Sequence, residues 1–423
     1  MTAIVGVLNK RAVAIAADSA MTVKKDGQTK IYNSARKIFK ISDSIPVGIM
    51  LSGNMDFMDA PWDVIMGQYR KYRDGRPLPH LKDYTDDFRT FLKTAEFLNN
   101  KETYRLYILS EMGNFYYRIK AEADKYMESY KNGIIVYDYQ CATRDALADA
   151  VIQYKDDGVS EEMKGLSLQS FLKSTKDEFG LLKELMMEES VPTGNFKDWK
   201  KAFYEYMVSN CFVDESELVF VGYGENEIFP AIQSVTVTGV VGGRLRSREG
   251  VYGEITNTND AMVFPFAQDD VMITLLKGIS PSLFAHMSTL QEDSVEKARE
   301  RIIDSLKEEG LSPEIVEKVK AISFEDIGTG FCDKSLSFIQ ENYIDGLNAA
   351  VDCFSIREMA DMAENLISVT GLQRHYTSLE ESVGGPVNVA VITKEDGFRW
   401  VKTSSETVCI GNTAISGTTS GSE

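Results

Sequence analysis

The sequence predicts an α+β fold, and three observations lead to that prediction. Strand-like apolar segments open the chain within residues 2–53, return at 217–246 and close it at 386–403. Longer helical patterns, rich in charged residues and tyrosine, lie between those groups. Because strands from distant parts of a chain can share a sheet, this order favours a layered protein with helices around its sheets.

The bulk composition excludes several classes of protein. The 423 residues carry a net charge of −18, so the chain lacks the basic surface that nucleic-acid binding requires. We expect no membrane association, because no apolar run approaches the ~20 residues that span a bilayer. Five dispersed cysteines and a start unlike a signal peptide predict a cytoplasmic protein with reduced thiols. With only three scattered histidines, we expect no histidine-based metal site.

The first element is a hairpin of two apolar strands, 2–8 and 12–18, around a polar turn at 9–11. A three-residue turn places Thr2 directly opposite Asp18, and opposed Cβ atoms in an antiparallel pair lie ~4.5–5.5 Å apart. If Met1 is removed, the hydroxyl of Thr2 and a free α-amine belong to one residue. An amine with an ordinary pKa of about 7.7–8.0 is a suitable general base for that hydroxyl.

The next strand, KIFKI at 37–41, carries a lysine among apolar residues. Alternation places Lys37, Phe39 and Ile41 on one face, which is the face expected to point inward. A buried lysine requires a carboxylate partner, and Asp18 is a candidate.

A third strand, VGIMLSG at 47–53, ends on a glycine. The apolar spacing from Asp56 onward predicts a helix there, so Gly53 is expected at a strand-to-helix turn. Backbone N–H groups at such a turn can stabilise an oxyanion, and glycine permits the close approach.

The rest of the chain alternates between helices and strands. Residues 80–212 are mostly helical, and two charged helices at 293–320 break at the sequence GLSP. Strands are expected at 217–224 and 234–246, and the chain closes with a strand pair at 386–403, turned by KEDG.

These motifs together resemble a known family. TAIVGV, VAIAADS, ARKIFKI and VGIMLSGN are similar to the opening of proteasome β-type subunits and of the bacterial HslV peptidase. The resemblance implies a four-layer αββα sandwich and hydrolysis of peptide or amide bonds through an acyl-enzyme. By motif, Thr2 matches the nucleophile, Asp18 the acid after the second strand and Lys37 the lysine that lowers the nucleophile's pKa. Gly53 matches the glycine whose N–H forms the oxyanion hole.

Two later segments also resemble this family, with departures. VGYGENE places Tyr223 where the family usually has a serine near the nucleophile's amine. TSLEESVGGPVNVAVIT places Glu380 and Val383 where the family usually has an aspartate and a serine, and Ser382 is adjacent. The side chains that orient the amine therefore differ from the family's pattern.

The resemblance implies a single domain of this type with insertions. Its core is expected at 1–75, 213–279 and 337–403, which contain the segments that resemble the family. The surplus forms two helical insertions, 76–212 and 280–336, and the Ser/Thr/Gly-rich residues 404–423 form a flexible tail.

Three functions are compatible with these residues. The first is a threonine-type hydrolase of peptides or amides that needs no cofactor and assembles as a homo-oligomer, as the resemblance implies. The second is a non-catalytic subunit or binding module that keeps the fold, which retention of Met1 would favour. The third is an amidase acting on a small molecule. The sequence identifies neither the substrate nor an unfoldase partner.

Overall fold

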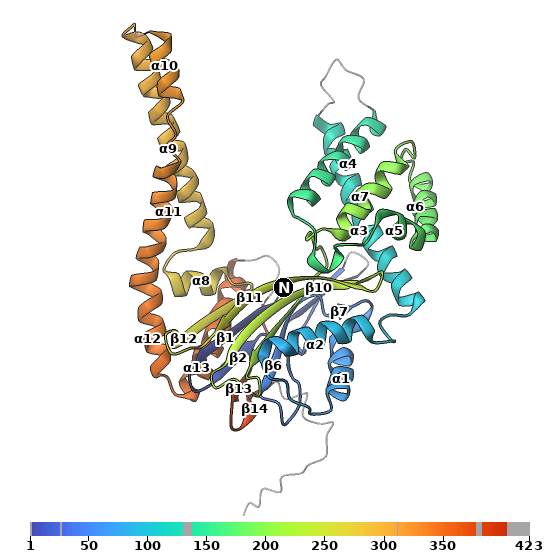
Figure 1. The fold of residues 1–423 in the computed structure, drawn as a ribbon, viewed down its shortest axis with the longest axis vertical. Coiled ribbons are helices and arrows are strands. Elements are labelled where there is room, and N and C mark those ends of the chain that lie inside the picture. The colour runs from blue at the N-terminus through green and yellow to red at the C-terminus, as the bar shows by residue number, and fades with distance from the viewer. Residues whose placement is uncertain (1, 26–27, 130–137, 311, 378–382, 404–423) are drawn as a thin grey trace, which may run out of the picture. The chain divides into compact units, whose positions relative to one another are not determined.

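The computed structural model describes residues 2–25, 28–129, 138–310, 312–377 and 383–403. The chain divides into two compact units: the first comprises Met1–Ala35, Ile255–Val391 and Trp400–Glu423, and the second comprises Arg36–Glu254 and Ile392–Arg399. Both units contain helices and strands, which confirms the predicted α+β class (Figure 1).

The first sheet is built around the N-terminal strand. Its order is β12 (Ala261–Ala267), β1 (Ala3–Asn9), β2 (Val13–Ala17), β13 (Asn388–Thr393) and β14 (Gly397–Lys402). Both β12 and β2 pair with β1 in antiparallel fashion. Every residue of β1 and β2 is buried, so these strands read as continuous apolar runs rather than as an alternation.

Asn9 shapes the turn between β1 and β2. Its side-chain Oδ1 accepts the N–H groups of Arg11 and Ala12, at 2.9 and 3.2 Å, and its own N–H donates to the carbonyl of Ala12 at 3.1 Å. The side-chain amide of Asn9 also donates to the carbonyl of Val351 at 3.0 Å. This single polar residue therefore closes the turn and attaches it to a helix of the same unit.

The remaining elements of the first unit are a small hairpin and a set of helices. The hairpin pairs β3 (Met21–Lys25) with β4 (Gln28–Tyr32), and the sequence did not predict it. The helices are α8 (Asp270–Lys277), α9 (Pro281–Glu308), α10 (Pro313–Lys320), α11 (Glu325–Ile339), a π-helical turn (Gln340–Ile344), α12 (Asp345–Cys353) and α13 (Ile356–Thr377).

Helix α13 supplies the core of the first unit. Its buried residues Met359, Ala363 and Ile367 recur at helical spacing and pack in one cluster with Ala3 and Val5 of β1. By contrast, α9 and α10 bury almost no side chain, and they run beside α11 as an extended helical hairpin (Figure 1).

The second sheet belongs to the second unit. Its order is β11 (Arg244–Glu254), β10 (Ala231–Val241), β9 (Ser216–Gly222), β6 (Val47–Gly53) and β5 (Ile38–Lys40), and every neighbouring pair is antiparallel. A separate two-stranded sheet in the same unit pairs β7 (Asp56–Phe57) with β8 (Ala60–Pro61).

The helices of the second unit lie between β8 and β9 in the chain. They are α1 (Trp62–Arg73), α2 (Leu81–Thr94), α3 (Lys101–Ser129), α4 (Tyr139–Asp156), a 3-10 turn (Glu161–Met163), α5 (Leu168–Ser174), α6 (Lys176–Glu188) and α7 (Phe196–Val208). Their aromatic side chains form one continuous core with the sheet, including an edge-to-face contact of Phe88 with Phe220, 5.5 Å between ring centroids.

Among the described residues, no helix is both long enough and apolar enough to cross a bilayer.

Candidate functional site

The hairpin register differs by one residue from the predicted register. In the structure Ile4 pairs with Ala17 and Val5 with Ala16, so Asp18 lies opposite Ala3 rather than opposite Thr2. The prediction failed because the turn closes between Asn9 and Ala12, which leaves a two-residue loop, one residue shorter than the loop assumed between Leu8 and Ala12. Asp18 is still diagonal to Thr2 across the hairpin.

Thr2 lies just before β1 and is held through its backbone. Its carbonyl accepts the N–H of Gln268 at 3.1 Å, and the residue is 5% exposed. The residue that follows β12 therefore fixes the backbone on the carbonyl side of Thr2.

The Asp18 carboxylate is a hub for three backbone amides. Oδ1 accepts the N–H of Ala3 at 3.0 Å, and Oδ2 accepts those of Ala20 and Gly384 at 3.2 and 3.3 Å. An anion with several backbone donors is strongly held, because each charge-assisted bond is about twice as strong as a neutral one. Asp18 therefore ties the start of β1, the exit of β2 and the segment before β13 to one point.

Ser19 completes that attachment. Its N–H donates to the carbonyl of Gly384 at 3.3 Å and its hydroxyl donates to the carbonyl of Pro386 at 2.8 Å. Gly385 between them has φ of +73°, and a Cβ there would lie 2.7 Å from the Ser19 hydroxyl oxygen. The segment SVGGP thus needs glycine at position 385 for both conformation and space.

Lys37 lies immediately before β5 in the second unit. It is 1% exposed, like Phe39 and Ile41, but Ile38, which alternation places on the opposite face, is also 1% exposed. Arg36 and Lys40 are partly exposed. The burial of Lys37 that the alternation predicts is therefore confirmed. Its carbonyl accepts the N–H of Leu51 at 2.8 Å, which fixes the backbone of Lys37 just before β5 begins.

Gly53 ends β6 in a left-handed conformation, with φ of +82°. A Cβ at this position would lie 2.2 Å from the carbonyl oxygen of Glu215, because the chain returns from the helical segment beside it. The position requires glycine for both reasons.

The predicted helix directly after Gly53 is wrong. Helix α1 begins at Trp62, and the short strands β7 and β8 occupy the interval. Asn54 prevents the helix by turning the chain, since its side chain accepts the N–H of Asp56 at 3.1 Å, and Met58 and Asp59 both adopt positive φ. Gly53 therefore does not lie at a helix N-terminus.

Gly53→Ala is expected to lower the free energy of unfolding by about 2–5 kcal/mol, from the left-handed backbone and the clash with Glu215 together. The matched control is Gly67→Ala in α1, where an added Cβ meets no atom within 4 Å. That change is expected to stabilise by about 0.5–1 kcal/mol. Chemical denaturation of both variants measures the difference, and equal effects would contradict this assignment.

Tyr223 follows β9 and is 1% exposed. Its N–H donates to the carbonyl of Pro46 at 2.9 Å, and its hydroxyl has no hydrogen-bond partner among the described residues. Burial raises the pKa of Tyr223, so the side chain remains a neutral phenol. The ammonium of Lys394 lies 6.0 Å from the ring centroid.

Glu380 and Val383 are the last two residues that the sequence singled out. Glu380 and the neighbouring Ser382 lie outside the described residues. Val383 is 2% exposed and packs in the core of the first unit.

The sequence did not reveal a buried charged pair in the second unit. Arg246 on β11 is fully buried and lies 3.3 Å from Glu111 on α3, which is 3% exposed. The Glu111 carboxylate also accepts the hydroxyl of Tyr206 at 2.5 Å. Glu111 lies on a buried helix face with Ile108 and Met112. A charged residue among apolar neighbours is the same sequence feature that identified Lys37.

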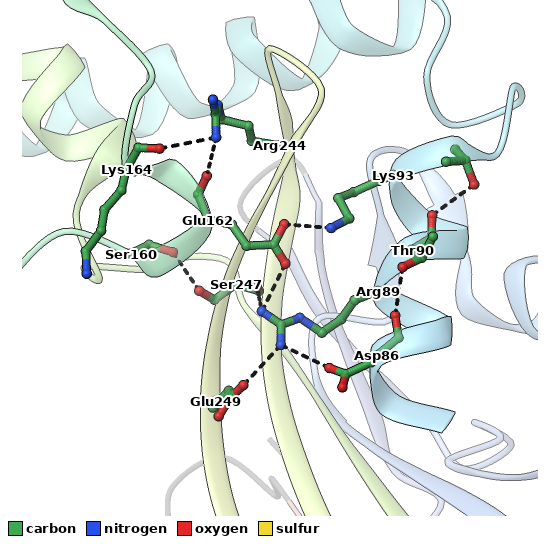
Figure 2. Close-up of polar contacts among 11 residues, drawn as sticks. Asp86, Arg89, Thr90, Lys93, Ser160, Glu162, Lys164, Arg244, Ser247 and Glu249 are labelled. Carbon is green, nitrogen blue, oxygen red and sulfur yellow. Dashed lines mark hydrogen bonds and ion pairs between the residues drawn. The ribbon is translucent and has the colours of Figure 1, made fainter. Parts of the chain in front are cut away.

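A second polar cluster attaches the segment after α4 to the sheet (Figure 2). Arg89 on α2 contacts Glu162 at 2.9 Å and Glu249 at 3.2 Å, and Lys93 contacts Glu162 at 3.0 Å. The Ser160 hydroxyl donates to the carbonyl of Ser247 at 2.7 Å. This cluster links α2, the 3-10 turn and β11, and its role is structural.

A metal centre is not evident in the part of the chain that the structure describes. No group of three or more His, Cys, Asp or Glu side chains there is arranged to hold an ion.

Comparisons with known proteins leave the family open. No family model matches the sequence, and no curated protein matches it. Among solved structures, the chain is similar to a mutant of Anbu from Hyphomicrobium sp. strain MC1, with a TM-score of 0.29 and 8% identity over 95% of this chain and 85% of that one. A score this low carries no argument about function, so the proposal below depends on this chain's own residues.

Proposed function

We propose that this protein is a threonine-type N-terminal-nucleophile hydrolase that cleaves peptide or amide bonds through an acyl-enzyme on Thr2. The proposal includes a four-layer αββα sandwich as a single domain, with the helical segments 76–212 and 280–336 as insertions. It requires Thr2 to be the N-terminus of the active chain, because the free α-amine serves as the base.

The proposed chemistry proceeds in two steps. The Thr2 hydroxyl attacks the substrate carbonyl, and its proton passes through a water to the α-amine and then to the departing amine, which leaves an ester on Thr2. Water then attacks the ester and releases the acid. Lys37 favours the deprotonated hydroxyl, Asp18 holds Lys37, and the Gly53 N–H stabilises the tetrahedral oxyanion.

Two further residues, Tyr223 and Glu380, complete the proposed site. Tyr223 and Glu380 replace the serine and the aspartate that the resembling family uses to orient the amine. We also propose that the protein is cytoplasmic and assembles as a homo-oligomer. The chemistry calls for no metal and no cofactor.

The observation that supports the proposal best is the attachment of Asp18. Its carboxylate accepts the N–H of Ala3, the residue next to Thr2, at 3.0 Å. The acid is therefore fixed against the backbone that carries the proposed nucleophile. The burial of Lys37, a cation at a position where alternation places apolar residues, is the second support.

Intact mass and covalent labelling test the proposal together. We expect the protein made in cells to lack Met1 and to be acylated by a β-lactone at Thr2. Thr2→Ser should retain labelling, since it keeps a hydroxyl, whereas Thr2→Ala should lose labelling and any hydrolysis by at least about a thousandfold. Retention of Met1 in the whole population, or equal labelling of Thr2→Ala, would show that Thr2 is not the nucleophile.

A non-catalytic subunit or binding module is the second candidate. The observation that favours it is the burial of Thr2, which is only 5% exposed. An unlabelled Thr2 in a chain that lacks Met1 would support this second function over the first.

A further inference from the structure

A cavity of about 410 Å³ lies within the first unit, where α8 packs against α9 and the π-helical turn (Figure 1). Its walls are mostly apolar and include the aromatic rings of Phe284, Phe331, Phe338 and Tyr343. Ligand cavities in proteins typically enclose about 300–1,000 Å³ and are lined by such side chains. The proposed hydrolysis does not use this cavity.

One wall of the cavity depends on a close approach between α8 and the π-helical turn. Gly278 ends α8 in a left-handed conformation, with φ of +72°, and its N–H donates to the carbonyl of Thr274 at 2.9 Å. A Cβ on Gly278 would lie 2.4 Å from the ring of Tyr343, so this ring packs directly on the backbone. Tyr343 belongs to the π-helical turn, and such turns within helices occur frequently at functional sites. Backbone geometry therefore sets this wall.

Several apolar side chains of the cavity are exposed. Phe338 is 58% exposed, Tyr343 is 44% exposed and Met287 is 41% exposed. Large apolar side chains that gather at one place on a surface mark binding sites. An alkyl chain that entered the cavity would remove this surface from water, which favours binding in proportion to the area covered.

The polar residues of the cavity favour an anion. Lys277 on α8 and Lys334 on α11 line it, Ser335 adds a hydroxyl, and no aspartate or glutamate is among the lining residues. Neither lysine forms an ion pair with a residue in the described ranges, although Lys277 acts on Asp269 at longer range. The two lysines therefore complement a negatively charged ligand, even though the whole chain carries a net charge of −18.

Apolar walls and two lysines together suit an amphipathic anion. An inorganic anion would leave the aromatic walls in water, and a neutral hydrocarbon would leave the lysines without a partner. We infer that this cavity binds a free medium-chain fatty acid, with its alkyl chain between Phe331 and Phe338 and its carboxylate on Lys277 and Lys334. This site is additional to the proposed hydrolysis and does not depend on Thr2.

Isothermal titration calorimetry with decanoate, below its critical micelle concentration, tests the inference. We expect saturable one-to-one binding to the full-length protein and equal binding to Thr2→Ala. From octanoate to decanoate, each added CH₂ should lower the Kd about fourfold, because the walls are apolar. Decylammonium has the same chain and the opposite charge, so it should bind at least about tenfold more weakly than decanoate.

Two lysine variants test the charged end of the site. Lys277→Gln and Lys334→Gln should each weaken decanoate binding about twofold to fivefold, and neither should weaken the binding of decylammonium. The matched control is Lys297→Gln, which removes an exposed lysine of α9 that does not line the cavity. This control should leave decanoate binding unchanged.

A second matched pair tests the apolar end of the site. Phe338 and Leu336 both lie on α11 and are 58% and 51% exposed, so neither change should prevent folding, but only Phe338 lines the cavity. Phe338→Ser should weaken decanoate binding about fivefold to tenfold, and Leu336→Ser should leave it unchanged.

Three results would overturn the inference. They are equal binding of decanoate and decylammonium, equal effects of the lysine variants and Lys297→Gln, and the absence of saturable decanoate binding. In the last case, dissociation of a homo-oligomer by Phe338→Ser but not by Leu336→Ser would assign the cavity to contact with a second copy of the chain.

Discussion

Arg246→Met is expected to lower the free energy of unfolding by about 3–5 kcal/mol, because it leaves a buried carboxylate without its counter-charge. The guanidinium lies 3.3 Å from Glu111 and donates to the carbonyls of Tyr206 and Cys211 at 2.9 and 2.6 Å. It also lies 4.5 Å from the centroid of the Tyr206 ring. Removing it therefore takes a donor from each of the two carbonyls and leaves the Glu111 carboxylate with the Tyr206 hydroxyl but without a counter-charge.

Equilibrium denaturation with a matched control measures this effect. Arg248→Met removes an arginine from the same strand, but that side chain is 44% exposed and pairs with Glu215 at the surface. The control should cost at most about 1 kcal/mol. The double variant Glu111→Leu with Arg246→Met should recover much of the loss, since no charge remains buried. Equal effects of Arg246→Met and Arg248→Met would contradict the role assigned to the pair.

Asp18→Ala is the second change with a large expected effect. It removes the acceptor of three backbone N–H groups, those of Ala3, Ala20 and Gly384. Each unsatisfied donor costs about 1–3 kcal/mol, so the loss for the three donors should amount to about 3–9 kcal/mol. Asp18→Asn should cost less, because one side-chain oxygen remains as an acceptor.

Denaturation and activity have to be measured on the same Asp18 samples. A loss of hydrolysis in Asp18→Ala alone does not show a chemical role, since the residue also holds three segments together. The matched control is Asp361→Ala on α13, an exposed carboxylate that should change stability by no more than about 0.5 kcal/mol. If Asp18→Ala is as stable as this control, the attachment argued from its hydrogen bonds is wrong.

Some features of the strands could be predicted from short sequence patterns alone. The apolar pattern of KIFKI correctly predicted that Lys37 is buried, although Ile38 on the opposite face is buried too, and KEDG located the turn between β13 and β14. The register of the first hairpin was not predictable from apolar pattern alone, because both strands are apolar throughout. The side chain of Asn9 decides it, by accepting two turn amides.

The prediction of a helix directly after Gly53 failed for a related reason. Helical spacing from Phe57 to Met66 is present in the sequence, but Phe57 is buried from a short strand rather than from a helix. Asn54 and the left-handed Met58 and Asp59 stop the helix until Trp62. Local turn chemistry overrides a periodic pattern of this length.

Partners far apart in sequence were beyond prediction. Glu111 and Arg246 are separated by 135 residues, and nothing in either local pattern identifies the other. Each is conspicuous alone, as a charge within an apolar surface, so sequence reasoning could have identified the residues but not the pair.

The position of β1 in the first sheet also sets an order of events during synthesis. Its neighbour β2 follows at once, but β12 and, beside β2, β13 come from residues 261–267 and 388–393. At roughly 5–20 residues per second, β13 is made about 20–75 s after β1. A two-stranded hairpin is only marginally stable alone. The buried hairpin of β1 and β2 is thus made well before β12 and β13 complete its sheet, while residues 36–254 are available to fold in the interval.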